Sequence, residues 1–579
     1  MFSADLQRII LLGALGLILV MLWQSWLEFQ SQYAPPGQAV GGAPSSQTPG
    51  SVAAPADAPA APATPAQATD IPAAPALPST PTAPSPADAP AVAVPARDLI
   101  HITTDLVRAQ IDPRGGDLVR VELLRHPVSV DKPDEPFVLM HRDAPALFVA
   151  QSGLIGGARA YPNHATEYAA AQRQYDLGDR ERIEVPLQWS APDGVVYQKI
   201  HRFHRDSYRI DIDFRVDNQT ADEWSGFVYG QLKQTEIKQQ GSLGFIGQLP
   251  SYHGAAIYTA EDKYEKIDYD DMREANLARD SASGWVAMMQ HYFVAAWLPV
   301  GDGAFQFYSG VGPGVGVGGA NNTQYRIGYN TKQPLRVAPG GQGALSAALF
   351  VGPKEQHRLR EQQVEGLLLT VDYGWLTPIA DPLFWLLDKI HGVTGNWGWA
   401  IVLLTLLVKA VFYPLSAASY KSMARMKKLQ PRLQTLKERY GDDKQKFQQE
   451  MMKLYKSEKV NPAGGCLPIL VQIPVFIALY WTLLESVELR QADFMLWLKD
   501  LSIPDPYFVL PLIMGASMLA QFFLNPAPVD PLQKKIMMAM PVVFTVFFLW
   551  FPAGLVLYWV VNNLLSIAQQ YYITRKYQD

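Results

Sequence analysis

The pattern of apolar and polar positions divides this chain into three regions, the first of which is an apolar segment followed by a polar linker. Residues 9–27 are predominantly apolar and follow Arg8, and no small-x-small cleavage site comes after them. We therefore expect an uncleaved signal-anchor transmembrane helix over residues 1–28. Residues 29–97 are almost entirely Ala, Pro, Thr, Ser and Gly, which predicts a disordered linker because such a segment cannot bury enough apolar surface to fold.

The second region, residues 98–352, alternates apolar and polar residues as strands do. Residues 208–217 alternate without a break, and residues 119–123 repeat the pattern, which is typical of strands with one buried face. Turn residues separate such runs, so the region predicts a large all-β sandwich. The turn signals are Pro113–Gly116, Ala191–Gly194 and Asp217-Asn218.

Two patterns within this region resemble sites but do not predict chemistry. Gly314–Gly319 is glycine-rich, yet no helix with Lys-Ser/Thr follows, so a hairpin loop is the better interpretation than a phosphate site. His201 and His204 lie three apart in a strand and should face opposite sides of the sheet, which argues against a shared metal ion. We predict no catalytic residues, no metal site and no cofactor.

The third region begins with connecting helices over residues 353–396. Residues 375–390 have apolar residues at helical spacing and a polar face, which predicts a helix lying on the outer membrane surface. A helix packed on the soluble domain is the alternative.

Long apolar runs then predict membrane spans. The second transmembrane helix covers residues 397–416 and carries Lys409, and residues 465–575 supply four more. With the signal anchor this makes six crossings, and the four later spans are predicted at Leu467–Ser486, Tyr507–Leu524, Ile536–Phe551 and Gly554–Ile573.

Residues 417–460, between the second and third spans, are strongly basic and have helical apolar spacing around the turn Gly441–Asp443. They predict a helical hairpin, with a kink at Pro431. Its side chains could contact varied partners, or the methionines could fill the seam between its own arms. The candidate contact residues are Met423, Arg425, Met426, Lys427, Lys428, Met451 and Met452.

The basic hairpin fixes the predicted orientation, because short loops rich in Lys and Arg stay in the cytoplasm. Both termini, including the tail 576–579, are then cytoplasmic, and residues 98–352 lie on the outer side.

Polar residues gather in the middle and inner half of the predicted spans. Such residues must face water or the interior of a bundle, so we predict a hydrated groove open to the cytoplasm. The alternatives are that Lys409 extends to the lipid headgroups and that the amides join helices. The groove residues are Lys409, Thr405, Gln472, Ser517, Gln521, Tyr558, Trp559, Asn562, Asn563 and Ser566.

Composition narrows the function. The 579 residues have a net charge of −5, which gives no indication of a nucleic-acid partner, and the single cysteine, Cys466, excludes internal disulfides. No nucleotide-binding motif is present, so the chain is not an ATP-driven pump. An ion- or proton-coupled transporter using Lys409 remains as an alternative, although the internal repeats typical of transporters are not evident.

Several motifs resemble the YidC/Oxa/Alb family of membrane protein insertases, in its Gram-negative form, over essentially the whole chain. The matching segments are Gly395–Gly398, Leu429–Pro431, Gly441–Lys444, Lys459–Cys466, Ser486–Arg490 and Phe548–Leu555.

This resemblance implies a non-enzymatic inner-membrane insertase and chaperone for nascent membrane proteins in the lipid bilayer, acting alone or with the Sec translocon (SecYEG). Five helices would form the insertase core, and the periplasmic sandwich would resemble galactose mutarotase. A sugar-processing enzyme on a membrane anchor is a further alternative, which the lack of an acid/base pair argues against.

The sequence departs from the family pattern at two groove positions and in the tail. Lys409 stands where the family has a groove arginine, and Trp559 replaces a frequent tyrosine. The tail is short and weakly basic, which argues against strong tethering to the ribosome.

Overall fold

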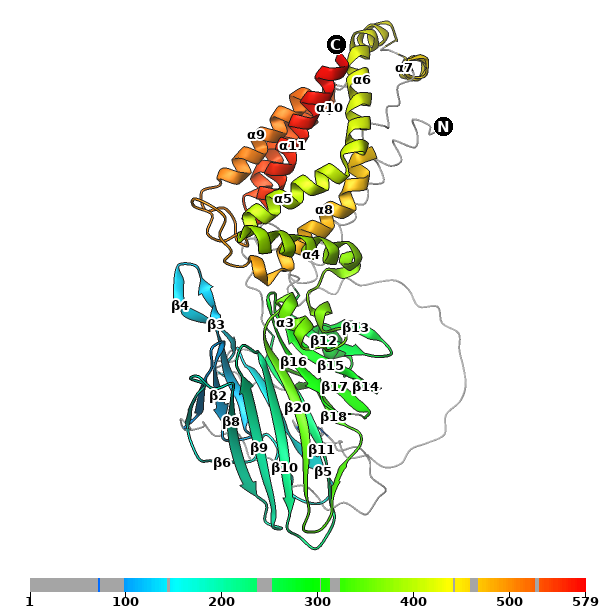
Figure 1. Cartoon of the computed structure of the whole chain (residues 1–579). Coiled ribbons are helices and arrows are strands. Elements are labelled where there is room, and N and C mark those ends of the chain that lie inside the picture. Colours follow the sequence, from blue (N-terminus) through cyan, green and yellow to red (C-terminus); the bar gives the residue numbers. More distant parts are fainter. Residues whose placement is uncertain are drawn as a thin grey trace, which may run out of the picture.

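The structure is a computed structural model. It describes residues 71–72, 98–142, 146–236, 252–301, 303–312, 323–440, 443–458, 467–525 and 531–578. A β-sandwich forms one end of the molecule and a helical bundle the other, with α3 and α4 between them (Figure 1). The predicted signal anchor, most of the predicted linker and the Gly314–Gly319 loop lie outside the described residues.

Two antiparallel-rich sheets form the sandwich. Among the described residues the larger sheet has 11 strands: β1 (Ile100–Thr103), β2 (Val107–Asp112), β3 (Asp117–Ser129), β4 (Lys132–Met140), β5 (Phe148–Gly156), β7 (Gln174–Asp176), β11 (Trp224–Thr235), β14 (Ala278–Ser281), β17 (Phe305–Gly312), β18 (Gln324–Thr331) and β19 (Leu335–Val337). The smaller has nine: β6 (Ala169–Ala170), β8 (Arg182–Ser190), β9 (Val195–His204), β10 (Arg209–Asn218), β12 (Gly254–Thr259), β13 (Lys263–Ile267), β15 (Gly284–Met289), β16 (Phe293–Pro299) and β20 (Gln342–Pro353).

The predicted alternation is confirmed in β10, where Ile210, Ile212, Phe214 and Val216 are buried in the core between the sheets. Strand β3 departs from it, because Glu122 is buried as well as the apolar residues beside it. Burial on both faces hides the half-exposed pattern expected for residues 119–123.

Two local predictions need correction. Asp217 and Asn218 are paired with β9 as the last residues of β10, so the turn signal placed there comes too early. Ile71, from the linker predicted to be disordered, packs against Ile155, Phe227 and Tyr229 of the larger sheet. The linker therefore contacts the sandwich at this residue.

The helical elements begin within the sandwich and continue to the C-terminus. They are α2 (Tyr269–Glu274), α3 (Gln356–Glu361), η1 (Leu367–Thr370), η2 (Gly374–Leu376), α4 (Thr377–Thr394), α5 (Trp397–Val411), α6 (Tyr413–Tyr440), α7 (Lys444–Ser457), α8 (Leu467–Glu485), η4 (Val487–Leu489), α9 (Val509–Leu524), α10 (Pro531–Phe548) and α11 (Ala553–Gln578).

The predicted continuous span over residues 397–416 is broken. Helix α5 ends at Val411, and the chain turns by 67° into α6, which continues through Pro431 as one helix. Within the described residues, no single helix is long and apolar enough to cross a membrane, whereas α5 and α6 together have sufficient length and apolar character. The predicted surface helix is α4, which starts at Thr377 and extends to Thr394. Trp385 on this helix and Trp375 just before it are both exposed.

The sharp reversal between α4 and α5 follows from two residues. Gly395 ends α4 with φ +65°, a conformation that favours glycine, and the side chain of Asn396 accepts a hydrogen bond from Trp399 N at 3.0 Å to cap α5. Asn396 Nδ2 also donates to the carbonyl oxygen of Phe494 at 2.9 Å. The reversal is thereby tied to the loop that follows η4.

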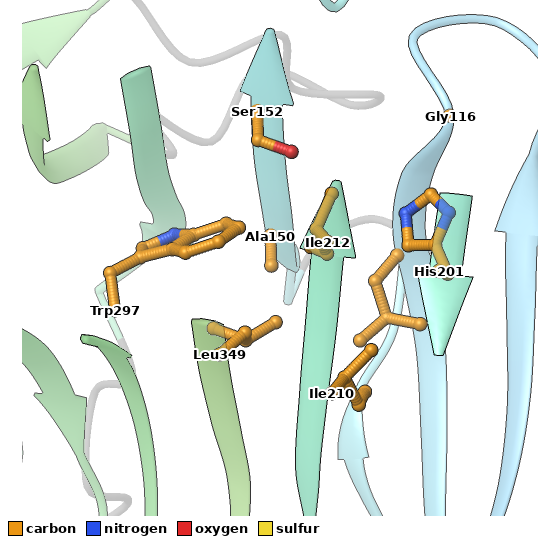
Figure 2. Close-up of a pocket in the computed structure, with 9 residues that line it drawn as sticks. Gly116, Ala150, Ser152, His201, Ile210, Ile212, Trp297 and Leu349 are labelled. Atoms are coloured by element: carbon orange, nitrogen blue, oxygen red, sulfur yellow. The ribbon is translucent and has the colours of Figure 1, made fainter. Parts of the chain in front are cut away.

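A sealed polar cluster lies between the two sheets. Lys199 Nζ donates to the carbonyl oxygens of Gly115 and Ser152 at 2.8 and 2.9 Å, while Gln151 donates to Asp117 at 2.8 Å. His201 and Ser152 line the adjoining space with apolar residues and Trp297, and that space has no room for a water molecule (Figure 2). That space therefore cannot hold a substrate beside His201.

His201 and His204 face opposite ways, as predicted. His201 is buried, whereas His204 Nε2 lies 2.9 Å from Asp211 on the other face. Burial, reinforced by the charge of Lys199, holds the pKa of His201 well below its usual 6.5. Protonation of His201 is therefore more costly in the folded than in the unfolded state. The contribution of the neutral His201 to the free energy of unfolding is present above pH 6.5 and is lost progressively as the pH falls below that value.

We predict that His201→Gln reduces this pH dependence. Between pH 7.5 and 5.5, the free energy that protects β9 amides from hydrogen exchange should fall by about 1.4 kcal/mol more in wild type than in the variant. His204→Gln, which alters the outer face of the same strand, is the matched control. Equal pH slopes in wild type and His201→Gln would contradict this assignment.

Candidate functional site: a polar cluster inside the helical bundle

The bundle has an inverted distribution of polarity. Its outward side chains are large and apolar, whereas Thr405 on α5 is 1% exposed and faces inward. A surface of this kind suits hydrocarbon rather than water, because contiguous exposed apolar patches are rare on soluble proteins. The exposed apolar residues include Leu403, Leu406 and Leu407 of α5, Leu512, Ile513 and Leu519 of α9, and Val542, Val543 and Val546 of α10.

Lys409 of α5 is a cation that lies within this bundle. It is half-buried, and its Nζ donates a hydrogen bond to Ser566 Oγ of α11 at 2.8 Å. Tyr420 of α6 also hydrogen-bonds to Ser566, and Ser566 Oγ donates to the carbonyl oxygen of Asn562 at 2.7 Å. The lysine is therefore joined to a chain of polar groups rather than left alone in apolar surroundings.

A second set of polar contacts continues along α11. Asn563 Nδ2 donates to Ser517 Oγ of α9 at 3.2 Å, and Ser517 Oγ donates to the carbonyl oxygen of Met514 at 2.6 Å. Two turns further along α11, Gln570 Nε2 donates to Asn525 Oδ1 at 2.9 Å. The polar side of α11 thus faces α5, α6 and α9 in turn.

The other predicted groove residues lie around these contacts. Gln472, Gln521 and Asn562 are half-buried, and Thr405 Oγ1 donates to the carbonyl oxygen of Ile401 within its own helix. The buried Tyr558 stacks on Phe476 with ring centres 6.0 Å apart, and Trp559 meets the same ring at 4.6 Å. These two aromatics line the apolar end of the α11 stripe.

Sequence reasoning missed Tyr420, Asn525 and Gln570. Tyr420 was assigned to the cytoplasmic hairpin, and the bend after α5 brings it back to α11. Gln570 follows Ser566 by four residues, so extending the helical spacing by one turn could have found it.

The hairpin consists of α6 and α7, joined by an ion pair between Arg432 and Glu458 at 2.5 Å. Asp443 begins α7 by accepting a hydrogen bond from Lys446 N at 3.0 Å. Among the predicted contact residues, Arg425 and Lys428 are exposed. Half-buried positions are those of Met423, Met426, Lys427, Met451 and Met452.

No group of three or more His, Cys, Asp and Glu residues in the described part of the chain is placed to hold a metal ion. The cluster around Lys409 offers instead one ammonium group, hydroxyls and amides, which solvate polar peptide groups. The fold of the chain and this cluster together define a membrane-associated protein, with a β-sandwich at one end and a polar site inside an apolar helical bundle.

Comparison with known proteins identifies the family. Residues 389–579 match the family described as "60Kd inner membrane protein", and residues 99–386 match "YidC periplasmic domain". The chain is 48% identical to membrane protein insertase YidC of Nitrosococcus oceani over 99% of both chains, and 46% identical to that of Pseudomonas fluorescens over 99% of this chain and 98% of the relative. This chain belongs to the YidC family of membrane protein insertases, which are inner-membrane proteins with a periplasmic domain.

Solved structures give weaker likenesses. An active YidC insertase matches 83% of this chain and 93% of its own with a TM-score of 0.37 and 19% identity. A galactose mutarotase related enzyme from Lactobacillus acidophilus matches 44% of this chain and 97% of its own with a TM-score of 0.29 and 11% identity.

The family membership confirms the predicted resemblance, the insertase class and its non-enzymatic character, since the relatives are named as insertases. It gives no support to the transporter alternative. The β-sandwich beside a helical core is also confirmed.

Packing of the site depends on a close approach of α9 and α10. A Cβ atom at Gly515 would overlap Thr545 Oγ1 of α10. We predict that Gly515→Ala destabilises the bundle by about 1–3 kcal/mol, because overpacking forces the helices apart. The measurement is the unfolding temperature of the detergent-solubilised protein.

Two variants test whether this contact is the cause. Thr545→Ala, combined with Gly515→Ala, should recover most of the loss because it removes the overlapping oxygen. Gly392→Ala on α4, where nothing lies within 4 Å of the added carbon, should be neutral or stabilising by up to about 1 kcal/mol. A loss at Gly515 that Thr545→Ala leaves unchanged would rule out this contact.

Proposed function

We propose that the chain inserts and folds membrane proteins in the bacterial inner membrane through the polar cluster around Lys409. The hydrogen bond from Lys409 Nζ to Ser566 is the observation that carries this proposal, because it places a solvated cation within an otherwise apolar bundle. Such a cation can attract and hydrate a polar or acidic client segment that must cross the hydrocarbon. The apolar client helix then leaves sideways into lipid, and no nucleotide is consumed.

The proposed topology has six crossings, with five helices in the insertase core. The segment over residues 1–28 is the signal anchor, and α5, α8, α9, α10 and α11 supply the other crossings. The two termini and the α6–α7 hairpin lie in the cytoplasm, because the hairpin is strongly basic. The sandwich lies in the periplasm, and α4 with its exposed tryptophans lies on the outer membrane surface.

The proposed partners are nascent membrane proteins, lipid and the Sec translocon (SecYEG). The exposed Arg425 and Lys428 with the half-buried methionines of the hairpin form the cytoplasmic contact surface. The tail contributes little to ribosome binding, because it is short and weakly basic.

The first test is insertion of a small two-span client into liposomes that contain this chain alone. Lys409→Glu should reduce insertion about 10- to 100-fold, since hydrogen bonds to charged groups contribute about 1.5–3 kcal/mol. Lys409→Arg should retain insertion, and deletion of residues 98–353 should leave it measurable. Lys499→Glu, a charge reversal at an exposed loop position, is the control.

Unchanged insertion by Lys409→Glu would reduce the lysine to an anchor at the headgroups. The wild-type chain alone could fail to insert the client and insert it only when SecYEG is added. That result would make the chain a translocon-dependent chaperone rather than an independent insertase.

The topology has a separate test in a Cys466→Ser background. Gln188 on β8 and Lys453 on α7 are both exposed, so each can be replaced by cysteine. In cells with a permeabilised outer membrane, an impermeant thiol reagent should label Gln188→Cys at once. It should label Lys453→Cys only after the inner membrane is opened, and labelling of both sites before that step would contradict the orientation.

A further inference from the structure

The last two residues of α8 and the segment that follows them are held by three parts of the sandwich. We call residues 484–491 the α8 seat. Its contacts come from the β3–β4 hairpin, from the start of β16 and from the chain between β20 and α4. None of these groups belongs to the polar cluster around Lys409.

The first contact joins the seat to α3. Glu488 Oε1 accepts a hydrogen bond from Gln356 N at 2.9 Å, and Tyr373 OH links Gln356 Nε2 at 2.7 Å to Ser486 Oγ at 3.3 Å. Burial raises the pKa of Glu488 to about 7. The seat therefore pairs a desolvated carboxyl with the first turn of α3.

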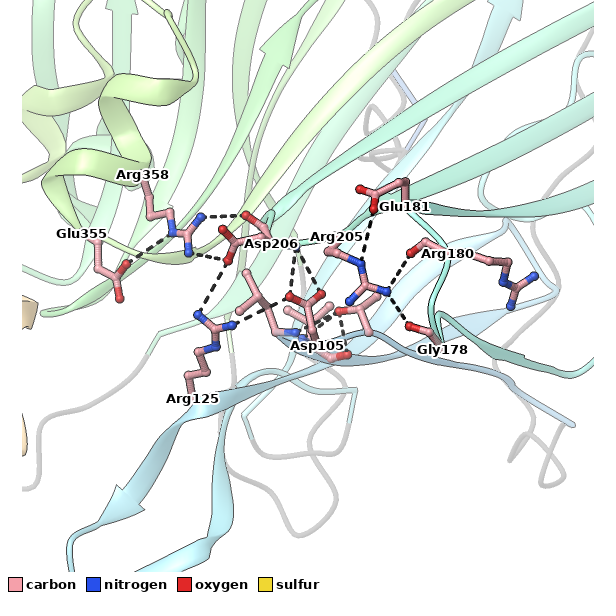
Figure 3. A network of polar contacts seen from close by, with 12 residues as sticks. Asp105, Arg125, Gly178, Arg180, Glu181, Arg205, Asp206, Glu355 and Arg358 are labelled. Carbon is pink, nitrogen blue, oxygen red and sulfur yellow. Dashed lines mark hydrogen bonds and ion pairs between the residues drawn. The ribbon is translucent and has the colours of Figure 1, made fainter.

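Helix α3 is itself fixed to the sandwich. Arg358 donates to the carbonyl oxygen and the carboxylate of Asp206 at 2.7 and 2.6 Å, and Arg125 of β3 approaches the same carboxylate at 3.6 Å (Figure 3). Because this network holds α3 on the loop after β9, the contact with Glu488 connects the seat to the sandwich as a whole.

The second contact lies at the start of β16. His291 Nε2 lies 3.1 Å from the carbonyl oxygen of Leu484, and Lys354 Nζ lies 3.8 Å from Glu485 Oε2. Both members of this ion pair are nearly inaccessible, with side chains 3% and 4% exposed. Buried charges of this kind are kept only where both partners stay in place.

The third contact is made by Arg490. Its Nη2 donates to the carbonyl oxygens of Pro127 and Val128 at 2.7 and 3.2 Å, and its guanidinium lies 5.8 and 5.6 Å from the ring centres of Phe137 and Phe293. Those two rings stack on each other at 4.3 Å. Gln491 Nε2 donates to the same carbonyl of Pro127 at 2.7 Å, so two neighbouring residues hold the end of β3 in the β3–β4 hairpin.

A planar guanidinium suits this position better than an ammonium group. Its Nη2 donates to two carbonyl oxygens while the delocalised, weakly hydrated plane lies near two aromatic rings, whereas a lysine presents a compact, strongly hydrated point charge.

We propose that Arg490 is a positioning residue that locks the β-sandwich in a fixed orientation on the periplasmic end of α8. The sandwich and α8 then move as one body, and the outer end of a core helix is set by the soluble domain. This inference does not depend on whether the chain inserts clients.

The test measures orientation directly in the full-length protein in lipid nanodiscs. In a Cys466→Ser background, spin labels at Gln188→Cys on the sandwich and Ile503→Cys in the core loop report their distance distribution. Arg490→Ala should at least double its width, and Arg490→Lys should give an intermediate width. Hydrogen exchange of amides in residues 478–486 should be about tenfold faster in Arg490→Ala.

Lys499→Ala is the matched control, since it removes an exposed charge from the same loop. It should keep the narrow distribution of the unaltered chain. A thiol crosslinker between Val128→Cys and Gln491→Cys should restore that distribution in Arg490→Ala, which separates loss of orientation from misfolding. A narrow distribution in Arg490→Ala without the crosslinker, or a broad one with it, would overturn the proposal.

Discussion

The helical part of this protein depends on solvating one ammonium group inside an apolar bundle. A cation there is costly unless polar groups surround it. Lys409 meets this requirement through Ser566, and Ser566 is joined in turn to Tyr420 and to the backbone of α11. The positions of α5, α6 and α11 are thereby coupled, because moving any of them removes part of the solvation shell of the lysine.

The sandwich meets a similar requirement differently. Lys199 lies between two sheets and donates to two backbone carbonyls, one in the turn before β3 and one in β5, whereas Lys409 donates to the side chain of Ser566. Its side chain is fully buried. Lys199 therefore belongs to the buried core of the sandwich, whereas the half-buried Lys409 lies where α5, α6 and α11 meet.

Much of this arrangement could be predicted from local sequence. The uninterrupted alternation of residues 208–217 specified β10 and its buried face, and the helical spacing of Lys409, Ser517 and the α11 residues indicated an inward polar side. Gly395 and Asn396 marked the reversal before α5.

The remainder depended on contacts between distant segments. Pro414, in the first turn of α6, is a sequence signal for a new helix after Phe412, but the apolar run continues across it. Without the bend, Tyr420 is read as part of a cytoplasmic hairpin. Arg490 was named only within the family motif Ser486–Arg490, and its contacts could not be predicted because Pro127 and Val128 lie more than 350 residues earlier in the chain. Tertiary packing, and not local propensity, determined the contacts of Arg490.

In the proposed topology, the same bend has a consequence for the surrounding bilayer. Helix α5 has 15 residues and is about 22 Å long at 1.5 Å per residue, whereas the hydrocarbon layer of a typical bilayer is about 30 Å thick. With α5 as a crossing, the bilayer beside it must thin to relieve this hydrophobic mismatch, at a cost of a fraction of a kcal/mol per Å. The shortness of a single helix would then deform the membrane locally.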